Sequence, residues 1–138
     1  MAFEQTLTTS FKQEVLLGVH DLDTDTIKMA LYTASADLTA STTVYGTTSE
    51  VVGTGYTAGG VILTGATVLT SGTTAYVDFD NAVWPTAAFT ARGALIYNAS
   101  KGNKAIAVLD FGSDKTATTS FTVQMPANTA TAALIRFA

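Results

Sequence analysis

Residues 91–111, ARGALIYNASKGNKAIAVLDF, decide the fold of this chain. Two apolar runs, 91–98 and 104–111, lie on either side of a short polar segment. That segment contains Lys-Gly-Asn at 101–103, which is typical of a hairpin loop because glycine and asparagine readily adopt positive φ angles. The sequence therefore predicts two antiparallel strands joined by a tight turn.

Both faces of each predicted strand are largely apolar. Alternation places Leu95 and Tyr97 on one face of the first strand and Arg92, Ala94 and Ile96 on the other. In the second strand it places Ala105, Ala107, Leu109 and Phe111 on one face and Ile106 and Val108 on the other. A strand that is apolar on both faces is typical of the covered middle of a sheet. We therefore expect this hairpin to form the centre of the fold.

The rest of the chain predicts one short helix and a series of short strands. A capping box of Ser10 and Gln13 predicts the start of a helix over residues 11–17. Strands are expected at 26–33, 61–70, 73–79, 120–125 and 132–137, with turns at 71–72 and 112–115 and a loop at 81–85. Many short strands at regular spacing predict an all-β fold, an antiparallel β-sandwich of jelly-roll-like type. We expect an extended arm over 1–10 and a single domain over 11–138.

Composition excludes several classes of function. The chain has 138 residues, a net charge of -4 and a pI of about 4.6, which argues against nucleic-acid binding because that needs a basic patch. No apolar run reaches the roughly 20 residues that span a bilayer, so no membrane partner is expected. Only 13% of the residues are charged, against about 25% in a typical soluble domain. Such a surface suits a protein that is partly covered by copies of itself or by partners.

Six segments in order carry a resemblance to a known family. They are the following stretches: FKQE at 11–14, GVHD at 18–21, DTIKMALYT at 25–33, GTGYTAGG at 53–60, ARGALIYN at 91–98 and AIAVLDFG at 105–112. In combination they resemble a small structural protein found in the virions of many tailed bacteriophages. The resemblance extends over nearly the whole chain from Phe11 onward.

The resemblance implies that the chain is part of a phage particle and supplies no catalytic residues. A capsid cement (decoration) protein on the outer surface of the head fits best, and a head-fibre or tail component is the alternative. The implied partners are the major capsid protein and further copies of this chain, with a homotrimer expected because a capsid lattice offers threefold positions. Residues 1–10 lack the apolar region of a signal peptide, so we expect synthesis in the host cytoplasm.

The partner-binding residues are expected on flexible segments. Loops as long as 34–60 are usually functional or interfacial. This loop and the arm would reach across to neighbouring capsid subunits, while the central hairpin holds the domain rigid. Apolar and aromatic side chains on or near these segments are the candidates: Phe3, Tyr45, Val51, Val52, Tyr56 and Trp84.

Three patterns that suggest chemistry are better explained by structure, and we expect no catalytic residue, cofactor or metal. Asp21, Asp23 and Asp25 match the opening of a calcium loop, but its glycine and glutamate positions hold Thr26 and Tyr32. Turn chemistry explains them best, with a weak calcium site as the alternative. The GxGxxA match at 53–58 precedes a strand rather than a helix. The single histidine, His20, has no nucleophile motif nearby and is expected to be a hydrogen-bonded corner residue.

Overall fold

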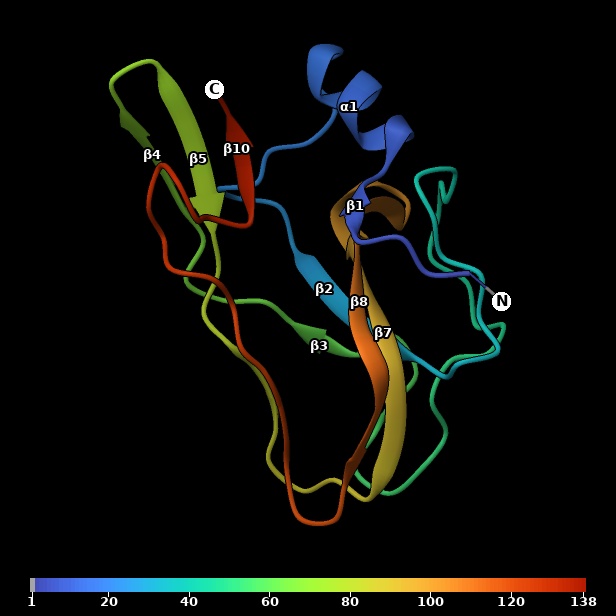
Figure 1. Ribbon diagram of the computed structural model, residues 1–138. Coiled ribbons are helices and arrows are strands. Elements are labelled where there is room, and N and C mark those ends of the chain that lie inside the picture. Colours follow the sequence, from blue (N-terminus) through green and yellow to red (C-terminus); the bar gives the residue numbers. More distant parts are fainter. Residues whose placement is uncertain (1) are drawn as a thin grey trace.

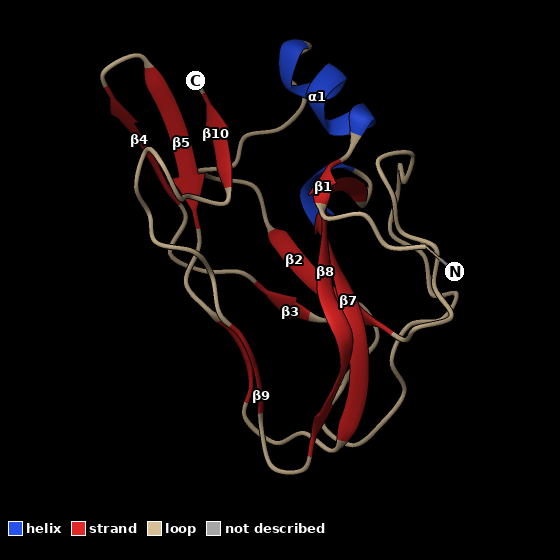
Figure 2. Cartoon of the chain, viewed as in Figure 1, coloured by secondary structure: helices blue, strands red, loops and turns tan. Residues whose placement is uncertain are grey.

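The computed structural model describes residues 2–138, and the fold is an all-β antiparallel sandwich with one short helix, as the sequence predicts (Figures 1 and 2). Its main layer is a five-stranded sheet in the order β1-β8-β7-β2-β3. The second layer consists of a three-stranded sheet, β10-β5-β4, and the two-stranded pair β6-β9. The elements have the following bounds: β1 Thr6–Leu7, α1 Thr9–Leu16, β2 Ile27–Tyr32, β3 Val61–Ile62, β4 Thr67–Ser71, β5 Thr74–Asp78, β6 Ala82–Trp84, β7 Phe89–Asn98, β8 Lys104–Ala117, β9 Phe121–Val123 and β10 Ile135–Phe137.

The predicted central hairpin is β7–β8, which lies in the middle of the five-stranded sheet. A short 3-10 helix, Ala99–Lys101, begins the connection, and Gly102 and Asn103 follow with φ angles of 67° and 60°. The predicted positive-φ loop is therefore confirmed at its last two residues. One face of the sheet packs against the second layer, and the other face is covered by the long loop and the N-terminal residues.

A β-bulge changes the predicted alternation in the second strand of the hairpin. Ile96 pairs with Ala107 and Tyr97 pairs with Ala105, so Ile106 is an extra residue on β8. As a result Ile106 and Ala107 both face the main core, while Ala105 contributes to the cluster on the opposite face. The predictions that Ala105 and Ala107 share one face and that Ile106 and Val108 share the other are therefore wrong. The faces predicted for residues 94–97 of the first strand are correct, but Arg92 lies over the Phe3 ring on the face of Leu95 and Tyr97.

Three other predicted elements differ from the structure. Residues 112–115 do not end a strand, because β8 continues through them to Ala117 with an irregular register and a φ of 83° at Gly112. The predicted strand 61–70 is divided at Gly65, whose φ is 70°, so that β3 joins the main sheet and β4 joins the second layer. Residues 82–84, predicted as a loop, form strand β6 and pair with β9.

The short helix is present, but its N-cap lies two residues earlier than predicted. Thr8, rather than Ser10, is the N-cap, and its side-chain oxygen accepts a hydrogen bond from the Phe11 amide at 3.2 Å. The Thr8 side chain also donates to the backbone carbonyl of Ala105 at 3.2 Å and is fully buried. Helix α1 is thereby joined to the central hairpin through its N-cap residue.

Residues 2–10 are part of the sandwich rather than a free arm; Met1 lies outside the described residues. Strand β1 pairs with Ala107 and Val108 at the edge of the main sheet. Before it, Phe3 forms a bridge with Leu38, and the Glu4 amide donates to the Leu38 carbonyl at 3.0 Å. The structure thus gives no support to an arm that becomes ordered only when it binds a partner.

Candidate partner-binding surface

The long loop between β2 and β3 is held in place by one buried carboxylate. Glu50 is only 7% exposed, and it accepts hydrogen bonds from the Tyr45 hydroxyl at 2.7 Å, the Tyr56 hydroxyl at 2.5 Å and the Gly59 amide at 2.8 Å. These donors are far apart in the loop, so the carboxylate draws its two halves together. The loop is irregular, as predicted, but it is fixed by this network.

The network continues through tyrosine side chains to the main sheet. The Tyr56 hydroxyl accepts from the Leu31 amide at 2.9 Å, and the Tyr97 hydroxyl donates to the Gly59 carbonyl at 2.6 Å. Tyr45 stacks on Tyr97 with ring centroids 4.6 Å apart. Burial, with a further contribution from the Glu50 charge, raises the pKa of Tyr97 to about 12, so this hydroxyl remains a donor at neutral pH. Burial likewise raises the pKa of Tyr56.

The six predicted partner-binding residues differ in how far the structure exposes them to solvent. Val51 and Trp84 lie in the main core at 4% and 2% exposure, which corrects the prediction that they offer surface contacts. Tyr45 and Tyr56 are half-buried, with their hydroxyls bonded to Glu50. Val52 alone has a fully accessible apolar side chain, at 95% exposure.

Phe3, the sixth candidate, anchors the N-terminal residues on β7. A Cβ atom at Gly93 would lie 2.4 Å from the Phe3 ring, so only glycine leaves room for this contact. The Arg92 guanidinium lies 5.4 Å from the centre of the same ring and forms an ion pair with Asp110. Phe3 is therefore held by neighbours within the chain.

The aspartate-rich link between α1 and β2 makes turns rather than a chelating cluster. Asp21 accepts hydrogen bonds from the Asp23 and Thr24 amides at 3.1 and 3.2 Å, an Asx-type turn. Asp25 instead faces Asn98, whose side-chain amide donates to it at 2.8 Å. Hydrogen bonding lowers the pKa of Asp21, chiefly through the Thr24 side chain. Among residues 2–138 no group of three or more acidic, histidine or cysteine side chains could hold a metal ion.

His20 is a hydrogen-bonded corner residue, as the sequence predicts. Its Nε2 lies 2.9 Å from Glu14 and its Nδ1 lies 3.0 Å from the Asn98 side-chain amide, so both ring nitrogens have partners within the chain. The ring is fully buried and packs on the Phe11 ring, with the two ring centroids 5.1 Å apart. These contacts join the link after α1 to the end of β7.

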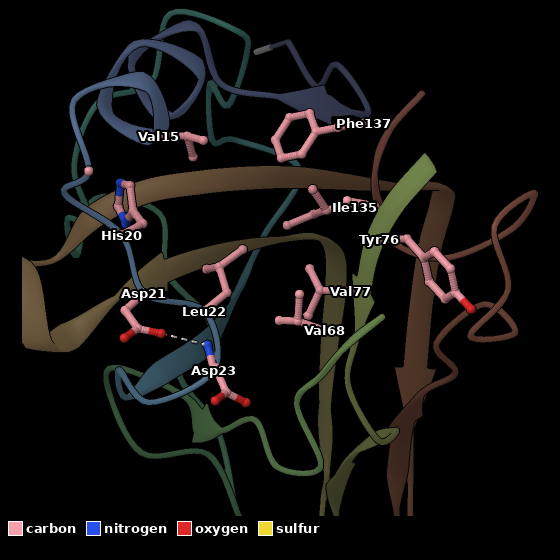
Figure 3. Close-up of a pocket in the computed structure, with 12 residues that line it drawn as sticks. Val15, His20, Asp21, Leu22, Asp23, Val68, Tyr76, Val77, Ile135 and Phe137 are labelled. Carbon is pink, nitrogen blue, oxygen red and sulfur yellow. Dashed lines mark hydrogen bonds between the residues drawn. The ribbon is translucent and has the colours of Figure 1, made fainter. Parts of the chain in front are cut away.

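An apolar groove lies between this link and the three-stranded sheet. Figure 3 shows Leu22, Val68, Val77 and Ile135 pointing toward one another, with Asp21 and Asp23 at the rim. The groove has a volume of about 670 Å³. Leu16 and Leu17, at the end of α1, are 88% and 70% exposed. None of these residues is among the predicted partner-binding residues, because whether an apolar residue of a short segment faces solvent depends on contacts distant in sequence.

Helix α1 is too short to cross a bilayer, and no other helix of the described chain is long and apolar enough to do so. Comparisons with protein-family models, with curated proteins and with solved structures found no match.

One buried polar group leads to a prediction on pH dependence. Asp78 is 2% exposed, its Oδ1 accepts from the Phe79 amide at 2.8 Å, and its Oδ2 has no hydrogen-bond partner among the described residues. Burial raises the pKa of Asp78, while the Phe79 and Leu134 backbone amides act in the opposite direction. Because the folded state holds this proton more tightly than the unfolded state, stability falls as the pH rises above about 4 through the raised pKa.

We therefore expect Asp78→Asn to stabilise the protein at pH 7 by on the order of 1 kcal/mol, and this gain to disappear toward pH 4. Urea denaturation of both proteins from pH 4 to 8 measures the difference. The control is Asp114→Asn, at an exposed position on β8, which should be neutral throughout. A loss of stability at pH 7 in Asp78→Asn would contradict the prediction.

Proposed function

We propose that this chain is a structural protein of a tailed-bacteriophage particle, a capsid cement protein that binds the outer surface of the head and stabilises it. The observation that carries the proposal is a set of exposed apolar side chains on a rigid, sparsely charged sandwich. Leu16, Leu17 and Val52 are 88%, 70% and 95% exposed. The resemblance of the sequence motifs to phage virion proteins supports the same proposal.

Cementing requires binding free energy that only the assembled shell can supply. A protein that binds the expanded lattice but not free subunits stabilises the lattice by mass action. Apolar contacts contribute about 25 cal/mol for each Å² removed from water, so burial of exposed leucine and valine side chains at each contact favours binding against the entropy lost on association. The major capsid protein is the proposed partner, with a homotrimer as the proposed form on the threefold positions of the lattice.

The charge of the chain favours the outside of the shell. Packaged DNA is densely negative, and a protein of net charge -4 gains nothing by facing it. The alternative, a head-fibre or tail component that binds host glycans, has less support. Glycan binding by stacking needs exposed aromatic rings, and the single tryptophan, Trp84, lies in the core.

The proposal predicts a measurable loss of head stability. We expect DNA-filled heads that lack this protein to release DNA at a lower temperature than complete heads, and the purified protein to restore the higher temperature. Val52→Asp should restore it less well because the charge disrupts an apolar contact. Thr48→Asp adds the same charge at an exposed position of the same loop and serves as the control. Equal release temperatures with and without the protein would contradict cementing.

A further inference from the structure

The β4–β5 hairpin presents an unusual edge to solvent. Residues 64–77 contain no charged side chain, and all five residues of β4 are exposed. The hairpin projects at one end of the molecule, and β4 forms the outer edge of the three-stranded sheet (Figure 1). Its only ladder in the described chain is with β5. Half of its backbone donors and acceptors therefore face solvent.

The turn of the hairpin determines which backbone groups point outward. Ser71 pairs with Thr74 around the two-residue loop 72–73, in which Gly72 has a φ of 59°. In such a hairpin the closing pair is hydrogen-bonded, and hydrogen-bonded and non-hydrogen-bonded pairs then alternate along the strands. Leu69 is thus bonded to Tyr76, while Val68 and Thr70 direct their N–H and C=O groups away from β5.

Other strand edges in the described chain are short or protected. Strands β1 and β3 have two residues each, and β6, β9 and β10 have three. The free edge of β8 beyond β1 carries Asp110, Asp114 and Lys115 and an irregular register. Charges and bulges are the usual means by which proteins prevent edge-to-edge pairing, and β4 has neither.

We propose that two copies of this chain pair through β4 in an antiparallel arrangement, which joins their three-stranded sheets into one continuous sheet. The twofold axis passes beside Leu69. In this register Val68 of each copy exchanges both N–H···O bonds with Thr70 of the other, and the two Leu69 side chains face each other. An antiparallel edge is complementary to itself about a twofold axis, so the second copy satisfies the outward groups of both strands at once.

The side chains of β4 favour a copy of the chain as the occupant. The edge is uncharged, so its self-pairing brings no like charges together, and the exposed Leu69, at 41%, meets an equally apolar surface. On the opposite face Val68, which is 51% exposed, lines the apolar groove beside Val77. In the proposed pair, β4 of the second copy lies next to Val68 and so extends this wall of the groove.

This contact is a property of the free protein and does not depend on a phage particle. It is twofold, whereas the homotrimer proposed above concerns the form bound to the lattice. Failure of the β4 pairing and failure of the cement function are therefore distinguishable, because the first is measured on the purified chain and the second on heads.

A cysteine at position 69 tests the proposal directly, since the chain has no cysteine of its own. In a non-hydrogen-bonded antiparallel pair the Cα atoms are about 4.5 Å apart, within the range of disulfides. We expect Leu69→Cys to form a covalent dimer under mild oxidation. Val83→Cys, at a position of 47% exposure on β6, is the matched control and should remain largely monomeric on denaturing gels.

Sedimentation at micromolar concentration provides the second measurement. We expect the wild-type protein to show a sedimentation mass of twice the 14.3 kDa of one chain. Thr70→Pro removes an outward N–H without breaking a bond to β5, so this variant should fold and sediment as a monomer. The proposal is overturned if wild type is a monomer or a trimer, if Thr70→Pro folds and remains dimeric, or if both cysteine variants cross-link at the same rate.

Discussion

Replacing Glu50 with alanine is expected to lower the free energy of unfolding by about 3 kcal/mol or more. The substitution leaves the hydroxyls of Tyr45 and Tyr56 and the amide of Gly59 without their shared acceptor. Each buried donor that loses its partner costs about 1–3 kcal/mol, reduced where water can enter. Urea denaturation of wild type and variant gives the difference.

A second glutamate provides the control for this prediction. Glu4 is exposed, and its carboxylate accepts one hydrogen bond, from the Ala40 amide at 2.9 Å. Glu4→Ala should therefore cost no more than about 1 kcal/mol. We also expect limited proteolysis to cleave Glu50→Ala within residues 40–60 much faster than wild type. If the two alanine variants are equally stable, Glu50 does not hold the loop.

A large effect of a single methyl group is expected at Gly60. This residue has a φ of 80°, and a Cβ atom there would lie 1.7 Å from the Met29 carbonyl oxygen on β2. Backbone atoms of the central sheet cannot move aside as a flexible side chain can. We expect Gly60→Ala to cost about 4 kcal/mol, from the clash together with left-handed backbone strain.

Gly72 separates the two contributions to that cost. It has a φ of 59°, yet a Cβ atom there would meet nothing within 4 Å. Gly72→Ala should therefore show backbone strain alone, about 1 kcal/mol. Thermal and chemical denaturation of both variants measure the difference. Equal losses would mean that the loop does not approach β2 as closely as the structure indicates.

The central hairpin could be predicted because local pattern and tertiary environment agree there. Apolar residues on both faces of 91–98 indicate a strand covered on both sides, and Gly102 and Asn103 indicate the turn. The bulge at Ile106 could not be predicted, since residues 105–108 are all apolar and shifting the alternation by one residue leaves the pattern unchanged. Register in such a strand is determined by its partners.

The fixed conformation of the long loop could not be predicted from the sequence either. Small polar residues and glycines between 34 and 60 are typical of a flexible segment, and only Asp37 and Glu50 are charged. A lone glutamate gives no periodic signal, although its position among tyrosines is the one feature that could have suggested a buried network. The partner-binding prediction failed at Val51 and Trp84 for a related reason. Whether an apolar residue near a loop faces solvent depends on contacts distant in sequence.

The central claim is that this protein binds the outside of a phage head, and an image reconstruction tests it most directly. The purified chain is added to expanded, DNA-filled heads that lack it, and the particles are imaged by electron cryomicroscopy. We predict additional density of the size of this sandwich on the outer surface, bridging neighbouring capsid subunits. Heads that remain bare, or density confined to the tail or to the inner surface, would contradict the account.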